Sequence, residues 1–67
     1  MSYLTGLIED VVLTCECIEF KLKDRSGEVL DLHFNECNYL DVFQISSESK
    51  FYVTCLTKGS ECVELLV

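Results

Sequence analysis

The chain has 67 residues, of which 49% are hydrophobic, and a formal net charge of -7 from twelve acidic and five basic residues. A chain of this length forms a single small domain, residues 1–67, and buries only about 60% of its unfolded surface. The negative charge argues against direct nucleic-acid binding, which requires cations that displace counterions, and it fits a partner protein with a basic surface. No signal-peptide pattern and no apolar run of about 18 residues is present, so we expect a cytoplasmic protein that does not bind membranes.

The first predicted strand covers residues 3–13, which are apolar on both faces, as expected for a well-covered strand. Gly6 lies inside it and predicts a bend or a close approach of another backbone. The apolar alternation then changes phase before Ile18. We therefore expect a β-bulge or a short connection near residues 14–16, which would absorb the change of phase.

The clearest pattern covers residues 18–34 and predicts a β-hairpin, because apolar and polar side chains alternate on both sides of a turn. Asp24 and Gly27 fit the first and last positions of a type I turn, and Gly27 accepts the left-handed conformation of a bulge. Turn and alternation agree on a three-residue loop, and hence on one register. The predicted pairs are Leu22 with Leu30, Phe20 with Leu32, Ile18 with Phe34, Lys21 with Asp31, and Glu19 with His33.

After this hairpin the alternation ends, and residues 35–44 predict a helix of one or two turns. Asn35 or Asn38 is the expected N-cap, because an asparagine side chain accepts a hydrogen bond from a free backbone N–H. The side chains expected on its buried side are Tyr39, Leu40 and Phe43. Residues 46–49 are expected to form a polar loop.

The last predicted hairpin turns at Lys58-Gly59. Its predicted strands are residues 50–56 and 62–67. Two registers are open, since a two-residue loop would pair Val53 with Glu64 and a three-residue loop would pair Val53 with Leu65. We favour the three-residue loop, because an unpaired buried carboxylate costs several kcal/mol.

Five strands with one short helix between the third and the fourth resemble an OB-fold barrel, and an SH3-like barrel is the near alternative. The predicted fold class is therefore mainly β: a small five-stranded antiparallel barrel. OB-like barrels often bind single-stranded nucleic acid through basic and aromatic side chains on strands two and three. The outward positions of these strands carry no aromatic residue here, so this role is not expected. Those positions are Glu19, Lys21, Lys23, Asp31 and His33.

The five cysteines and the single histidine form no metal-binding or catalytic motif. The close pair Cys15-x-Cys17 lacks the C-x-x-C spacing of a zinc knuckle, and an extended strand would hold its sulfurs about 6.5 Å apart. His33, the only histidine available as a base, is expected on the surface opposite Glu19. We therefore expect no enzyme, no metal and no cofactor. The cysteines expected to be reduced and to fill the core are Cys15, Cys17, Cys37, Cys55 and Cys62.

Two functional hypotheses concern binding to other proteins. The first is a non-enzymatic acidic module that occupies a basic site on a partner protein, and such a stand-alone domain resembles the compact inhibitors of phages and mobile elements. The carboxylates expected to form its binding face are Glu9, Asp10, Glu16, Glu61 and Glu64. The second is an assembly subunit of a larger complex.

A third hypothesis is a homo-oligomeric protein that binds a small nucleotide-type ligand in a pocket between subunits. The expected lining of that pocket is Arg25, His33, Tyr39 and Tyr52. A homo-oligomer is expected because the C-terminal strand is apolar on both faces, and a bare sheet edge of this kind would aggregate unless it were covered. The predicted interface residues are Leu65, Leu66 and Val67.

Overall fold

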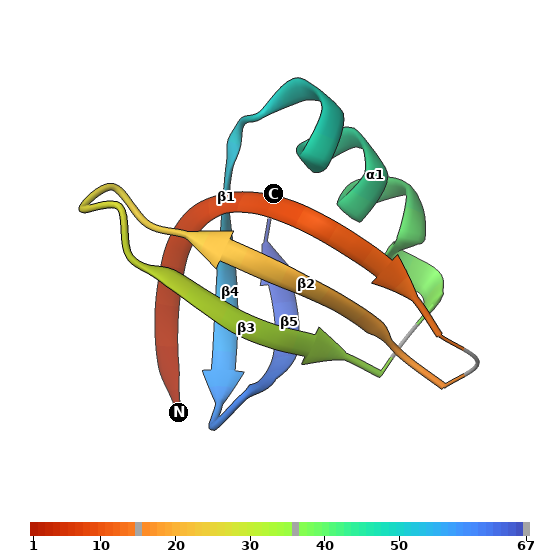
Figure 1. Cartoon of the computed structure of the whole chain (residues 1–67). Helices are drawn as coiled ribbons and strands as arrows, with labels where there is room; N and C mark the ends of the chain where they lie inside the picture. The colour runs from red at the N-terminus through yellow and green to blue at the C-terminus, as the bar shows by residue number, and fades with distance from the viewer. Residues whose placement is uncertain (15, 36, 67) are drawn as a thin grey trace.

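The structure, a computed structural model, describes residues 1–14, 16–35 and 37–66. Its strands are β1 (Ser2–Leu13), β2 (Ile18–Lys23), β3 (Val29–Phe34), β4 (Tyr52–Lys58) and β5 (Glu61–Leu66). The 3-10 helix η1 (Cys37–Tyr39) leads into helix α1 (Leu40–Ser49), and both lie between β3 and β4. The strands close a barrel in the order β1-β2-β3-β5-β4 (Figure 1). These findings confirm the small, mainly β, five-stranded barrel with a helix between the third and fourth strands, and they are consistent with either the OB-like or the SH3-like alternative.

The barrel is mixed, which corrects the prediction that all neighbouring strands are antiparallel. β3 and β5 run parallel where they meet, at His33 and Glu61. The other neighbouring pairs are antiparallel. Alternating directions cannot continue around a closed ring with an odd number of strands, so one pair of neighbours has to run parallel. This contact is short, and the His33 backbone N–H donates to the Ser60 carbonyl at 2.9 Å beside it.

The β2–β3 hairpin has the predicted register in every predicted pair. At its turn the Gly27 N–H donates to the Asp24 carbonyl at 3.1 Å, and Gly27 has a φ of 94°. The Asp24 carboxylate accepts hydrogen bonds from the Ser26 hydroxyl, the Ser26 N–H and the Glu28 N–H. These bonds, that of the Ser26 hydroxyl first, hold the pKa of Asp24 below its usual value.

Strand β1 belongs to both halves of the barrel. Residues 2–7 pair with β4, and residues 7–13 pair with β2. Gly6 lies where the strand passes from one half to the other, and the predicted close approach is confirmed. A Cβ added to Gly6 would lie 2.5 Å from the carbonyl oxygen of Lys23. Only glycine fits at this crossing, because any side chain would collide with backbone.

A β-bulge changes the phase of β1 between Glu9 and Val12, and Asp10 within it has a left-handed φ of 51°. The predicted change of phase is therefore real: the bulge lies earlier than residues 14–16, and the predicted short connection lies between the end of β1 at Leu13 and the start of β2 at Ile18. Cys15 lies outside the described residues. Beyond the bulge Val12 is 53% exposed, so the prediction of a well-covered strand is wrong at this end.

Helix α1 is longer than predicted, because the expected polar loop of residues 46–49 continues the helix. Ser46 is fully buried, like Phe43 one turn earlier, and α1 packs on β1. Neither predicted asparagine caps α1, since Tyr39 occupies the N-cap position without a side-chain hydrogen bond. The C-terminal cap is Lys50, which has a left-handed φ of 55° and donates its N–H to the Ser46 carbonyl at 2.9 Å.

Neither predicted register of the last hairpin is correct, because a bulge in the hairpin shifts the pairing partway along it. Next to the turn Thr57 pairs with Cys62, and beyond the shift Cys55 pairs with Leu65. Cys62 and Leu65 both face the core as a result, while Glu64 remains exposed. The chain thus avoids a buried carboxylate through a bulge and not through the length of the loop.

An aromatic cluster occupies the centre of the core. The ring centroid of Phe43, from α1, lies 4.6 Å from that of Phe20 and 5.8 Å from that of Phe34. Tyr39 packs edge-on against Phe34, with ring centroids 5.0 Å apart. The buried hydrophobic residues are Ile8, Ile18, Phe20, Leu22, Leu32, Phe34, Phe43, Val53, Cys55, Cys62 and Leu65.

The predicted oligomer interface at the C-terminus is divided by this packing. Leu65 lies in the core and is only 5% exposed, so it offers little surface to a second copy. Leu66 points outward and is 44% exposed. Val67 lies outside the described residues. Within the described part of the chain, Leu66 alone of this set presents a large apolar surface.

Candidate functional site

A groove crosses the outer face of the β2–β3 hairpin and encloses about 580 Å³. The hairpin supplies most of its lining, because outward side chains alternate with buried ones along β2. The bulge of β1 and the turn before β5 supply the remainder. We call this surface the β2–β3 groove. Its lining residues are Asp10, Val12, Glu19, Phe20, Lys21, Asp31, Leu32, His33 and Ser60.

Lys21 lies in the groove among carboxylates from two neighbouring strands. Its Nζ is 3.9 Å from Oδ2 of Asp10. Lys21 also pairs across the sheet with Asp31 on β3 and with Glu9 on β1. The Lys21 side chain is 46% exposed and that of Asp10 is 71% exposed, so this ion pair stabilises the fold by less than about 1 kcal/mol. Its greater effect is on the local charge of the groove.

The bulge in β1 places Asp10 in the groove. Aspartate tolerates the left-handed φ of 51° better than most residues, because its short side chain costs little strain there. In regular alternation along β1, Asp10 would share a face with the buried Ile8. The shift of register instead leaves Asp10 exposed beside Lys21.

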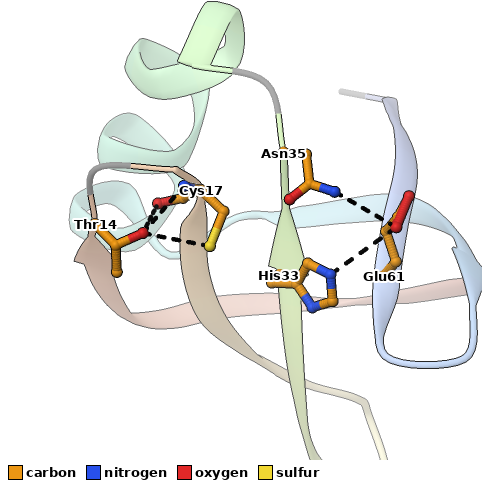
Figure 2. Close-up of polar contacts among 5 residues, drawn as sticks. All are labelled: Thr14, Cys17, His33, Asn35 and Glu61. Carbon is orange, nitrogen blue, oxygen red and sulfur yellow. Dashed lines mark hydrogen bonds and ion pairs between the residues drawn. The ribbon is translucent and has the colours of Figure 1, made fainter.

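At one end of the groove β5 contributes a further carboxylate. Figure 2 shows the Glu61 carboxylate on β5 facing two side chains, those of His33 in β3 and of Asn35 directly after β3. Oε2 of Glu61 lies 3.9 Å from Nε2 of His33 and accepts a hydrogen bond from Nδ2 of Asn35 at 3.5 Å. The predicted pairing of His33 with Glu19 is confirmed in the register, but its nearest charged partner is Glu61.

The connection between β1 and β2 is a tight turn held by Thr14. Its hydroxyl donates to the Cys17 carbonyl at 2.9 Å and accepts from the Cys17 N–H at 3.0 Å. The Thr14 N–H also donates to the Cys17 carbonyl at 3.0 Å. Figure 2 shows these two residues apart from the His33–Glu61 cluster. Glu16 is exposed in this turn and does not line the groove.

The predicted acidic face is only partly brought together. Asp10 lines the groove, and Glu61 lies at its end beside His33. Glu9 pairs with Lys21 across β1 and β2, whereas Glu64 pairs with Leu56 on the other side of the barrel. Two carboxylates that sequence reasoning left out, Glu19 and Asp31, belong to the groove. Their outward positions in the hairpin were predicted, but the nearby carboxylates of β1 and β5 come together with them only in the folded barrel.

The residues of the alternative small-ligand pocket do not share one cavity within the chain. The Arg25 guanidinium lies over the Tyr52 ring, 4.8 Å from its centroid. Tyr39 packs against Phe34, and His33 lines the groove. The turn after β2, which carries Arg25, and the 3-10 helix that carries Tyr39 lie at opposite ends of the molecule (Figure 1).

Two of the cysteines fill the core as predicted. Cys55 and Cys62 are at most 2% exposed, and the Cys62 thiol donates to the Glu64 carbonyl at 3.4 Å. The side-chain hydrogen bond with Cys62, together with burial, raises the pKa of the Cys55 thiol. Cys17 is free and half-buried, while Cys15 and the Cys37 side chain lie outside what the structure describes. Among the described residues, no three histidine, cysteine, aspartate or glutamate side chains are grouped so that they would hold a metal ion.

Comparisons with known proteins identify no relative, because no family model, no curated protein and no solved structure matches the chain. No helix within the described ranges is long and apolar enough to cross a membrane. The groove is therefore interpreted from its own residues.

Proposed function

We propose that the chain is a non-enzymatic protein-binding module whose β2–β3 groove holds a basic segment of a partner protein. The observation that carries this proposal is the gathering of carboxylates in the groove and at its end, with the Lys21 ammonium group and the His33 imidazole beside them. The carboxylates concerned are Asp10, Glu19, Asp31 and Glu61. Carboxylates arranged in this way attract arginine and lysine side chains and increase the rate of encounter with a basic surface.

The apolar part of the groove supports the same class of ligand. Val12, which is 53% exposed, contributes an apolar side chain to its lining, whereas Phe20 and Leu32 border the groove but are buried in the core. An arginine or lysine side chain carries an apolar stem and a charged end, so it would bury the stem there and pair its end with a carboxylate. A single-stranded nucleic acid would meet the repulsion of these carboxylates and would find no exposed aromatic side chain in the lining on which a base could stack.

Occupation of a basic site gives this module a biological use. A partner that binds nucleic acid presents cations on its own binding surface, and an acidic groove would compete with the nucleic acid for them. This is the mode of action of a compact inhibitor, and it accounts for the net charge of -7 on so short a chain.

A titration with a basic peptide tests the proposal. A fluorescein-labelled peptide of alternating lysine and arginine should bind with an affinity that falls steeply as the salt concentration rises. The backbone amide NMR signals that move on binding should belong to β2, β3 and the bulge of β1. A labelled oligo-thymidine of similar length should not bind.

A matched pair of variants separates the groove from the overall charge. Glu19→Lys should weaken peptide binding by about tenfold or more, whereas Glu28→Lys, the same change of charge in the turn outside the groove lining, should weaken it by less than about threefold. Equal losses in the two variants, or amide shifts spread evenly over all acidic residues, would overturn the proposal. Binding of the oligo-thymidine would do the same.

A further inference from the structure

The barrel has a second outer face that carries no charged side chain at its centre. It is formed by the first half of β1, by β4 and by the end of β5, which pair side by side. We call it the Thr5–Thr54 face. Its residues are Tyr3, Thr5, Leu7, Tyr52, Thr54, Leu56 and Leu66, which alternate with inward residues along their strands.

The register arranges this face in rows across the strands. In the middle row Thr5 pairs with Thr54, which pairs in turn with Leu66. The hydroxyls of Thr5 and Thr54 are 2.9 Å apart and form a hydrogen bond. Tyr3 with Leu56 forms the row on one side, and Leu7 with Tyr52 forms the row on the other. Because one of these hydroxyls donates to the other, the two threonines partly satisfy each other within the face.

Large apolar side chains remain open to solvent on this face. Tyr3 is 62% exposed, Leu66 is 44% exposed and Tyr52 is 42% exposed. Charged neighbours lie at its margin, where Glu64 pairs with Leu56, Lys23 pairs with Leu7, and Arg25 lies over the Tyr52 ring. Tyrosine with aliphatic side chains and few charges is the composition of the centre of a protein–protein interface.

We propose that the occupant of this face is a second copy of the chain, packed sheet against sheet. The net charge of -7 makes two copies repel each other wherever their carboxylates approach. β2 and β3, which carry Glu19 and Asp31 of the groove, cross in front of β4 and β5 in Figure 1, so these two strands lie on the other side of the barrel from β4 and β5. Contact through the Thr5–Thr54 face is the arrangement that keeps those carboxylates apart, and a two-fold axis there matches an uncharged surface with itself.

The size of the face sets the strength of the dimer. A stable interface of standard size buries about 800 Å² on each partner. That is close to a fifth of the 4312 Å² of accessible surface, a large share for the seven residues of the Thr5–Thr54 face. We therefore expect a dissociation constant in the range of about 10 to 100 µM, which falls as salt screens the repulsion between the copies.

Sedimentation velocity over a concentration series, at low and at high salt, tests this inference on the wild-type chain. The dimer should grow with concentration and should be stronger at high salt, which is the opposite of the salt dependence expected for the basic peptide in the groove. The two proposals can therefore fail separately. A wild-type chain that stays monomeric up to about 500 µM at high salt would overturn the dimer.

Variants and amide signals locate the contact. Tyr3→Lys should raise the dissociation constant by about tenfold, whereas Ile45→Lys, on an α1 residue that is 51% exposed, should leave it within about twofold. On dilution of the wild-type chain, the amide NMR signals that move should belong to the first half of β1, β4 and β5, and this readout requires no variant to fold. Signals that move mainly in α1 or β2, or a larger effect of Ile45→Lys, would contradict the assignment.

Discussion

The two outer faces of this barrel cover similar interiors but carry different chemistry. The β2–β3 groove has charged side chains at its outward positions, whereas the Thr5–Thr54 face has tyrosine, threonine and leucine at the equivalent positions. Both rest on the same apolar core, and both include part of β1. The inward positions of each strand thus determine the barrel, and the outward positions are free to determine what each face binds.

Gly6 permits one strand to belong to both faces, and its replacement should have the largest effect. Gly6→Ala would set a Cβ 2.5 Å from the Lys23 carbonyl oxygen, so β1 and β2 would have to separate. We expect a loss of about 3 kcal/mol of unfolding free energy, which is a large part of the stability of a chain this short. Urea unfolding followed by circular dichroism measures it.

Gly27→Ala is the matched control for this prediction. Gly27 also has a positive φ, of 94°, but no atom lies within 4 Å of an added Cβ. Only backbone strain of about 1 kcal/mol is then expected. If both alanine variants lost the same stability, the collision with Lys23 would not be the reason why glycine is needed at position 6.

Alkaline pH should first destabilise the half of the barrel that lies beneath the Thr5–Thr54 face. The pKa of Cys55 in the folded chain lies above the ordinary thiol value of 9.0, because of its hydrogen bond with Cys62 and its burial. The thiol therefore contributes its full stability below that ordinary value. Above it the unfolded chain loses the proton first, and stability falls by about 1.4 kcal/mol per pH unit. Unfolding free energies between neutral pH and about pH 10 would show this slope.

The fall of the unfolding free energy with pH arises from buried thiols only if replacing them abolishes it. The hydrogen bond with Cys55 lowers the pKa of Cys62, whereas the burial of Cys62 raises it, so replacing Cys55 alone would leave a second buried thiol with a raised pKa. The double variant Cys55→Ala/Cys62→Ala should lower stability at neutral pH, because it leaves a cavity, but should flatten the dependence above pH 9.0. An unchanged slope in the double variant would assign the alkaline loss to other groups.

Removal of a buried hydroxyl group in α1, beneath β1, should increase the unfolding free energy. Ser46 is fully buried, and its Oγ has no hydrogen-bond partner among the described residues. Ser46→Ala should raise the unfolding free energy by about 1 kcal/mol, since the cost of an unsatisfied hydroxyl disappears. Ser47→Ala in the same helix measures the contribution of helix propensity alone. A loss of stability in Ser46→Ala would indicate that the hydroxyl is satisfied in solution.

The smallest expected effect on stability comes from removing one polar contact on each face. Lys21→Met removes the exposed ion pair with Asp10, and Thr5→Val removes the hydrogen bond with Thr54. Each should change stability by less than about 1 kcal/mol at low salt. At about 1 M salt the effect of Lys21→Met should vanish, while that of Thr5→Val should persist. The same salt dependence in both would remove the distinction between the charged and the uncharged face.

The sequence alone determined the β2–β3 hairpin, with all its predicted pairs and its turn. The reason is local: Asp24 and Gly27 specify the turn, and apolar alternation on both sides then allows one register. The sequence also predicted that another backbone approaches Gly6 closely, because a glycine within an apolar strand marks a position without room for a side chain. The core positions of Cys55 and Cys62 followed from their reduced, apolar character.

Tertiary structure decided the features that depend on neighbours distant in the sequence. The last hairpin shifts register between Leu56 and Thr57, because Cys62 and Leu65 must both reach the core while Glu64 stays in water. The helix extends through Ser46, because packing against β1 buries that side of it.

The groove likewise exists only in the closed barrel. The bulge of β1 brings Asp10 to the hairpin, and the parallel contact of β3 with β5 brings Glu61 there. Local alternation within a strand specifies which side chains face outward. Which outward side chains meet is set by how an odd number of strands closes into a ring, and no short stretch of sequence contains that information.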